Sequence, residues 1–94
     1  GAWYDDETYK KYLKIFDESL PQIDLIQEAL STYGYPVEIT RENDEQTKFG
    51  VRAFQLHFRA NNYSGSMDAE SMAILMALIE KYRGNEIKKL QAKF

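Results

Sequence analysis

The sequence predicts an all-α fold, a compact three-helix bundle with an additional N-terminal helix. Apolar residues recur at the spacing of a helical turn in each of its long segments. Glycine, proline or polar clusters separate these segments, and aspartates that can cap helices stand where helices should begin. A unit of helix, loop and capped helix also occurs twice, with the middle helix belonging to both copies. The chain of 94 residues has the length of one small domain, so the bundle accounts for most of it.

The first helix is predicted over residues 6–17, and we expect residues 1–18 to form an N-terminal helical segment. Either Asp5 or Asp6 can cap this helix, because both carboxylates stand at its first turn. Its apolar residues follow one another at intervals of four and three, which places them in one stripe: Tyr9, Leu13 and Phe16.

A second helix is predicted over residues 21–33, because Pro21 is tolerated in a first turn and Gly34 suits a helix end. The inner face of this helix is apolar and consists of Ile23, Ile26, Leu30 and Tyr33. Residues 35–43 are predicted to form a loop, since Tyr35 precedes a proline and is held away from helical angles.

The third helix is predicted over residues 44–59, with Asp44 as its cap. At about 100° per residue, it carries two apolar stripes on nearly opposite sides. The first stripe comprises Thr47, Val51, Phe54 and Phe58, and the second comprises Phe49, Ala53 and Leu56. A helix that is apolar on two sides has neighbours on both. We therefore expect the second and fourth helices on one side, the N-terminal segment on the other, and a close backbone approach at Gly50.

The fourth helix is predicted over residues 69–83, between the capping residue Asp68 and the terminating residue Gly84. Its apolar face consists of Met72, Leu75, Met76, Leu78, Ile79 and Tyr82. These boundaries place the three-helix domain at residues 19–84 and a C-terminal tail at residues 85–94. The tail is either a frayed helix or a packed one, because three apolar residues recur in it at helical spacing: Ile87, Leu90 and Phe94.

The composition argues against several classes of function. A net charge of −3 and a pI of about 5.1 lack the basic excess of nucleic-acid binders, and they disfavour anionic membranes. No segment approaches the roughly 20 apolar residues that span a bilayer. The chain has no cysteine, and its one histidine, His57, cannot by itself supply the ligands of a zinc site. Helix capping explains Asp44 and Asp68, so we expect no catalytic residue, metal or cofactor in this chain.

The two copies of the repeat share a motif of glutamine, glycine, capping aspartate and hydroxyl residue. The motif reads Ile26-Gln27, Leu30, Gly34-Tyr35; Asp44, Thr47, Gly50-Val51, Phe54-Gln55; and Gly65, Asp68, Ser71, Leu75. With these residues the chain resembles the bacterial peptidoglycan-binding domain, a three-helix fold. In that family a glycine usually stands three residues before the first capping aspartate. Here the position is Arg41, so we expect the first loop to differ in shape.

The flanking residues extend the resemblance to the C-terminal domain of Gram-negative envelope N-acetylmuramoyl-L-alanine amidases. They are Gly1-Ala2-Trp3, Phe54-Gln55-x-His57-Phe58-Arg59, Tyr63-x-Gly65 and Asp68-Ala69-Glu70. The resemblance implies a module that binds peptidoglycan and targets an amidase whose zinc lies in a separate catalytic domain. It also implies a bacterial cell-envelope location, periplasmic or outer-membrane-associated, or secretion. We expect a monomer with no nucleic-acid partner and no membrane insertion; the alternative is a protein–protein interaction module of an envelope protein.

One polar strip could bind such a ligand. Lys48, Arg52, Gln55 and Arg59 share a narrow face of the third helix, and arginine can grip the carboxylates of murein stem peptides. The alternative is a solvated face paired with nearby glutamates. Gln27 and Gln55 stand at the edge of the core, where each bonds a loop backbone or a ligand. Together with the adjoining loops, the strip gives these predicted ligand-binding residues: Arg59, Arg52, Gln55, Asn61, Tyr63 and Tyr35.

Overall fold

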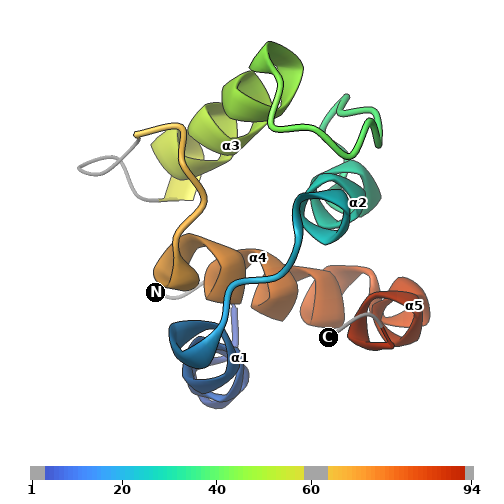
Figure 1. Cartoon of the computed structure of the whole chain (residues 1–94). Coiled ribbons are helices and arrows are strands. Elements are labelled where there is room, and N and C mark those ends of the chain that lie inside the picture. Colours follow the sequence, from blue (N-terminus) through green and yellow to red (C-terminus); the bar gives the residue numbers. More distant parts are fainter. Residues whose placement is uncertain (1–3, 59–63, 93–94) are drawn as a thin grey trace.

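A computed structural model describes residues 4–58 and 64–92 of the chain. The described chain folds into helices without a strand, which confirms the all-α prediction (Figure 1). The elements are α1 (Asp6–Glu18), α2 (Ile23–Tyr33), α3 (Glu45–Phe58), α4 (Ala69–Tyr82), the short 3-10 helix η1 (Gly84–Glu86) and α5 (Ile87–Gln91). The four long helices agree with their predicted bounds to within two residues. None of the described helices is both long and apolar enough to cross a membrane.

Helix α4 forms the centre of the molecule. Every residue from Ser71 to Ile79 is buried, as expected of a helix that is apolar around its whole circumference. Figure 1 shows α4 crossing the middle of the fold, with α1 on one side and α2 and α3 on the other. The prediction that α3 would be the helix with neighbours on two sides is therefore wrong, because α4 takes that place.

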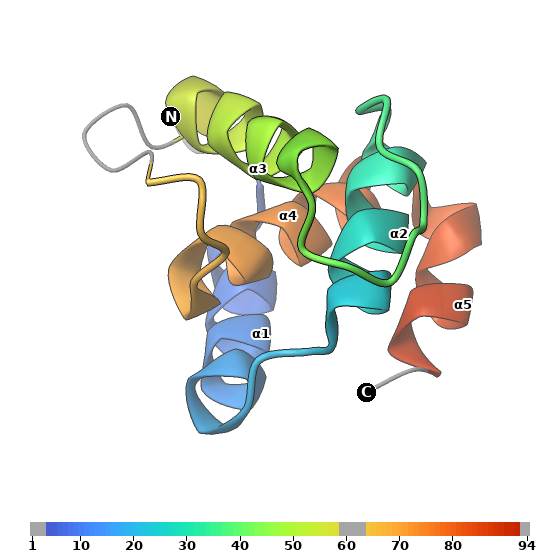
Figure 2. The same ribbon diagram turned by 45° about the horizontal axis from the view of Figure 1, so that its top comes forward.

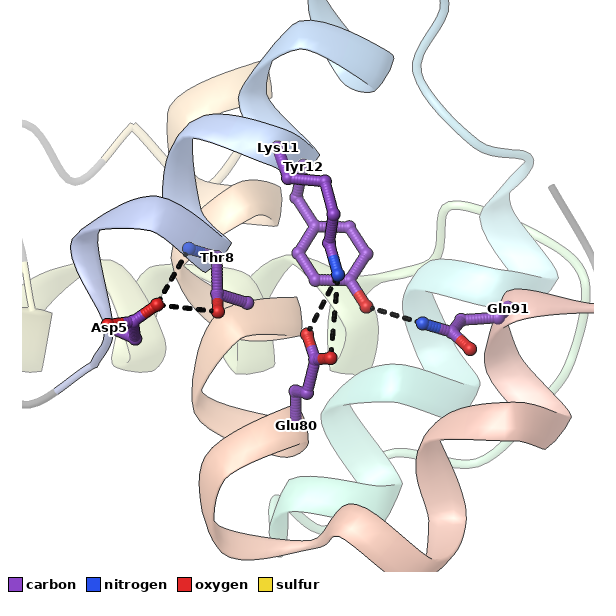
Figure 3. A network of polar contacts seen from close by, with 6 residues as sticks. All are labelled: Asp5, Thr8, Lys11, Tyr12, Glu80 and Gln91. Carbon is purple, nitrogen blue, oxygen red and sulfur yellow. Dashed lines mark hydrogen bonds and ion pairs between the residues drawn. The ribbon is translucent and has the colours of Figure 1, made fainter.

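The N-terminal helix packs against α4 and not against α3. Asp5 is its cap, since the Asp5 Oδ2 accepts the backbone N–H of Thr8 at 3.0 Å and the Thr8 hydroxyl at 2.9 Å (Figure 3). These hydrogen bonds stabilise the ionised carboxylate and lower the pKa of Asp5. Tyr12 and Phe16 enter the core from the inner face of α1, with their rings stacked 6.0 Å apart.

The predicted second stripe of α3 is consequently left at the surface. Phe49 is 68% exposed and Leu56 is 47% exposed, and Ala53 is exposed between them. Figure 2 shows why: α3 lies along the outer edge of the fold, with one long side facing away from the other helices. Its other side supplies Val51 and Phe54 to the core, as the first stripe predicted.

In the described part of the C-terminal tail, α5 packs against the rest of the fold, whereas Phe94 lies outside the described residues. Ile87 and Leu90 of α5 belong to the core. Gln91 Nε2 donates a hydrogen bond of 2.9 Å to the hydroxyl of Tyr12, and Lys11 Nζ lies 3.4 Å from Glu80 beside it (Figure 3). Burial raises the pKa of Tyr12 to about 12, with the Gln91 hydrogen bond acting in the opposite direction.

Two further predictions concern single positions. A close approach was expected at Gly50, and there the Val37 side chain lies against the α3 backbone: a Cβ on Gly50 would lie 2.6 Å from Val37 Cγ2. No side chain larger than hydrogen fits without moving Val37, so the helix accepts a residue with poor intrinsic propensity. Tyr82 was predicted to be a core residue but is 51% exposed, because it lies in the last turn of α4.

Candidate functional site

The loop between α2 and α3 is anchored by a buried side chain, that of Gln27. Its Nε2 lies within hydrogen-bonding distance of Thr47 Oγ1 (2.7 Å), Thr40 Oγ1 (3.0 Å) and the Glu42 carbonyl oxygen (3.0 Å). Its Oε1 accepts the backbone N–H of Arg41 at 2.9 Å. One amide group thus fixes both the loop and the first turn of α3, and leaving its buried atoms unpaired would be unfavourable.

The loop before α4 repeats this arrangement with Gln55 of α3. Gln55 Oε1 accepts the backbone N–H of Gly65 at 2.9 Å. Gln55 Nε2 donates to the carbonyl oxygen of Ser66 at 2.9 Å and to the hydroxyl of Ser71 at 3.2 Å. The side chain has an exposed fraction of 0%, like that of Gln27. The two halves of the repeat therefore share side-chain chemistry as well as sequence.

Each loop ends at an aspartate that caps the following helix, as predicted. Asp44 Oδ1 accepts the backbone N–H of Thr47 at 3.2 Å and its hydroxyl at 2.6 Å. Asp68 Oδ1 accepts the backbone N–H of Ser71 at 2.7 Å. The hydroxyl hydrogen bond from Thr47, followed by that from Thr40, lowers the pKa of Asp44 to about 2. Both carboxylates are thus occupied in holding the helix starts.

The first loop places a left-handed residue where the family usually has a glycine, and the second loop of this chain does the same. Arg41 has φ 68°, in the left-handed region, and Gly65 at the matching place has φ 85°. Both residues donate their backbone N–H groups to a glutamine Oε1. Because Arg41 has a Cβ, its left-handed conformation is strained. The expected difference in shape from the first loop of other family members stays a prediction.

The residues of the predicted cationic strip do not share one surface. Lys48 and Arg52 are exposed on α3, whereas Gln55 is buried and does not lie on the surface with them. A glutamine whose amide is used entirely inside the fold cannot also contact a ligand, so we remove Gln55 from the candidate site. Arg59, Asn61 and Tyr63 lie outside the described residues.

Lys48 and Arg52 line a shallow depression, which we call the cationic cup. It has a volume of about 230 Å³, and its other lining residues are Glu45, Phe49, Ser64 and Gly65. Lys48 Nζ lies 3.6 Å from Glu45 Oε1 in a solvent-exposed ion pair, which is weak and easily exchanged. The Lys48 ammonium can therefore exchange Glu45 for another carboxylate at little cost.

Tyr35 lies on the other side of Phe49, in what we call the neutral groove. The groove consists of two adjoining depressions of about 340 and 430 Å³, and both are lined by Tyr35 and Ala53. Tyr35 is held by aromatic neighbours, with ring centroids 6.0 Å from Phe54 and 6.5 Å from Tyr33. Burial raises its pKa, so the phenol stays neutral at physiological pH.

Phe49 forms the ridge between cup and groove, and sequence reasoning missed it as a surface residue. It lines the cup and also one depression of the groove. No local signal would have found it, because the spacing of Phe49, Ala53 and Leu56 is the same whether or not another helix covers them. His57 lies at the far end of the groove, with its ring 4.6 Å from that of Phe58. Within the described residues, no three side chains of metal-binding type come together.

A helical scaffold with two glutamine-anchored loops and an open face on α3 defines a small binding domain. Residues 19–75, more than half of the chain, match the family described as a putative peptidoglycan binding domain. The chain belongs to this family of peptidoglycan-binding domains.

Its relatives include cell-wall amidases. The chain is 40% identical over 84 residues to N-acetylmuramoyl-L-alanine amidase AmiD of Escherichia coli (strain K12), covering 87% of this chain and 30% of that protein. A crystal structure of AmpDh3 from Pseudomonas aeruginosa is 46% identical, with a TM-score of 0.73 and coverage of 88% of this chain and 33% of that one. The E. coli AmiD complex with anhydro-N-acetylmuramic acid-L-Ala-D-gamma-Glu-L-Lys matches with 37% identity and a TM-score of 0.67, covering 87% of this chain and 32% of that one. This chain thus spans about a third of the length of these relatives.

Proposed function

We propose that this chain is a non-catalytic module that binds peptidoglycan and holds an N-acetylmuramoyl-L-alanine amidase at its substrate. The observation that carries the proposal is the family match over residues 19–75, joined to amidase relatives of 40% and 46% identity. The reaction, with the zinc that the resemblance implies, is assigned to a catalytic part outside this chain. The place of action on this proposal is the bacterial cell envelope.

The benefit of such a module comes from effective concentration. When such a domain is bound to the cell wall, the enzyme tethered to it meets the bond that it cleaves in an intramolecular event. The affinity of the module itself can then be low, which suits an enzyme that must move along a large insoluble substrate. A shallow, open face such as the cup and groove of α3 is compatible with weak, reversible binding.

The binding surface we propose is this outer face of α3. Arg52 supplies a guanidinium for carboxylates of stem peptides, and Tyr35 supplies an aromatic face. Phe49 joins them as the exposed ring between cup and groove. Arg59, Asn61 and Tyr63, which follow α3 in the chain, stay predicted ligand residues.

Binding to insoluble sacculi tests the proposal. Arg52→Ala and Arg59→Ala should each weaken the free energy of binding to purified sacculi by about 1 to 3 kcal/mol, the range for a charged hydrogen bond. Co-sedimentation with the sacculi measures this loss. Lys14→Ala, an exposed residue of α1, is the matched control because it removes one positive charge from another face. Failure of the unaltered protein to sediment with sacculi would refute the proposal.

A protein partner is the second candidate, and one observation favours it. Two large apolar side chains of α3, Phe49 and Leu56, are exposed. Exposed apolar surface is a feature of protein interfaces. Under this reading, sacculi stripped of protein would not bind, whereas sacculi with their associated proteins would.

A further inference from the structure

We propose that the neutral groove binds the glycan of peptidoglycan, as an uncharged N-acetylated sugar, and does not bind the charged stem peptide. This inference rests on the proposed function and names the part of peptidoglycan that the groove recognises. Tyr35 and Ala53 line both depressions of the groove, whose volumes are about 340 and 430 Å³. Small-molecule sites typically measure roughly 300 to 1,000 Å³, so each depression is large enough for a small ligand.

The lining of the groove is poor in charge. Among the described residues, no aspartate, glutamate, lysine or arginine lines it, and His57 is the one lining residue that can carry a charge near neutral pH. Two charged residues lie close to the groove without lining it. Glu38 pairs its backbone with Gln46, and Arg83 Cζ lies 5.9 Å from the centroid of the Tyr33 ring. A charged ligand group would lose its water here without gaining an opposite charge, which is unfavourable.

The two parts of peptidoglycan differ in charge. In a stem peptide that begins L-Ala-D-γ-Glu, the γ linkage leaves the α-carboxylate of the glutamate free, and the end of the peptide adds another carboxylate. The sugars carry neutral acetamide groups. The lactyl group of muramic acid is also neutral as long as an amide joins it to the peptide. An uncharged groove therefore favours the sugar over the peptide.

The surface of the groove suits the faces of a sugar ring. Its aromatic lining residues are Tyr33, Tyr35, Phe49, His57 and Phe58. A pyranose with equatorial substituents presents C–H groups on both faces, and an aromatic ring packed against such a face buries apolar surface of both partners. Ligand sites are typically lined in this way, by apolar and aromatic side chains with a few polar groups that fix the orientation.

Two polar groups of the groove are available for that orienting role. The hydroxyls of Tyr33 and Tyr35 form no hydrogen bond with another described residue, and both are accessible, because no unpartnered polar side-chain atom in the described chain is buried. Burial of the rings raises the pKa of both phenols, so each keeps a proton that it can donate to a sugar hydroxyl or an acetamide carbonyl. The amide of Gln46, in contrast, is already used by the Glu38 backbone, with two hydrogen bonds of 2.8 Å.

Chemical-shift titration with two soluble probes tests the assignment: an N-acetylglucosamine tetrasaccharide and the peptide L-Ala-D-γ-Glu-L-Lys. The tetrasaccharide should shift the amides around Tyr35 and Ala53, and the peptide should leave these amides in place. Because the tetrasaccharide carries no charge, its affinity should change less than about twofold between about 0.02 and 0.5 M salt, a range over which interactions between exposed charges are strongly screened.

Three variants sharpen the test. Ala53→Glu places a carboxylate at a position that lines both depressions, and it should weaken tetrasaccharide binding at least about tenfold. Leu56→Glu is the matched control, because it adds the same charge to an exposed position of the same helix that does not line the groove. Tyr35→Phe removes one unpartnered hydroxyl and should weaken binding about two- to tenfold. Thermal melts of all three should stay close to that of the parent protein.

The outcomes distinguish this inference from the proposed function. If the chain sediments with sacculi but the tetrasaccharide does not shift the groove, or the peptide does, the inference is overturned and peptidoglycan binding stands. Equal losses in Ala53→Glu and Leu56→Glu, or affinity for the tetrasaccharide that falls steeply with salt, would overturn it as well. If sacculi do not bind at all, both fall. Concentration-dependent self-association that Ala53→Glu abolishes would show that a second copy of the chain occupies the groove, which also overturns the inference.

Discussion

Replacing Arg41 by glycine should stabilise this protein. Arg41 has φ 68°, a left-handed conformation that disfavours residues with a Cβ by roughly 1 to 2 kcal/mol. Glycine removes that strain but gives the unfolded chain more freedom, which returns about 0.4 to 1 kcal/mol. The backbone N–H that Gln27 Oε1 accepts is present in both residues, so the loop anchor survives. The net expectation for Arg41→Gly is a gain of about 0.5 to 1 kcal/mol in the free energy of unfolding.

The matching position of the second loop provides the reciprocal experiment. Gly65 has φ 85°, and among the described residues a Cβ there would meet Lys48 O at 3.6 Å and Arg52 Cβ at 3.8 Å, which are ordinary contacts. Gly65→Ala should therefore lose about 0.5 to 1 kcal/mol, because the strain is again partly offset by the reduced freedom of the unfolded chain. Urea unfolding measures both changes as shifts of the midpoint with an unaltered m-value. A destabilised Arg41→Gly together with a neutral Gly65→Ala would refute the reasoning, because backbone strain would then not govern these loops.

Three further predictions concern the scaffold. Phe54→Ala should cost about 3 to 5 kcal/mol in unfolding free energy, since Phe54 is fully buried between α3 and its neighbours; a loss under about 1 kcal/mol would contradict its place in the core. Asp44 should make stability depend on pH: its pKa is about 2 in the folded state against 3.8 otherwise, so its contribution is present above pH 3.8 and is lost as the pH falls towards 2. Asp44→Asn should flatten this acid limb in urea titrations, while Asp17→Asn on the exposed side of α1 should leave it unchanged. Removing residues 85–94 should lower the melting temperature markedly, because Ile87 and Leu90 leave the core and Tyr12 loses its Gln91 partner; an unchanged melting temperature would show that α5 adds no stability.

The sequence predicted helices well because local signals determine them. Aspartate caps, Gly34 and the spacing of apolar residues act within one or two turns, and the helix bounds followed from them. Tertiary partners were harder to predict. Phe49, Ala53 and Leu56 have the spacing of a buried stripe, yet α1 packs against α4 instead. Periodicity identifies an apolar face without saying which helix covers it, or whether any does.

The candidate site was also predictable only in part. Arg52 and Tyr35 were identified from residue type, and they prove to flank one exposed ridge. Gln55 was assigned to the surface because its angle on the helix is close to that of the cations. Gln55 is buried because the loop before α4 folds back over it, and the Gly65 N–H donates to its Oε1. Helical periodicity does not encode this contact between residues ten positions apart. The left-handed conformation of Arg41 was likewise not predicted, because this conformation favours glycine and an arginine does not indicate it.

The two glutamine anchors have a consequence for engineering. Gln27 reaches its loop N–H 14 residues later, whereas Gln55 does so after 10 residues, a difference of four within the same hydrogen-bonded frame. The frame therefore tolerates insertions between its fixed points, as the hypervariable segments of other recognition scaffolds do. Insertions could be placed at Ile39, which is exposed, while Val37 stays in the core and the anchors and the helix caps remain untouched. A small domain without disulfides would then serve as a host for libraries selected against different cell walls.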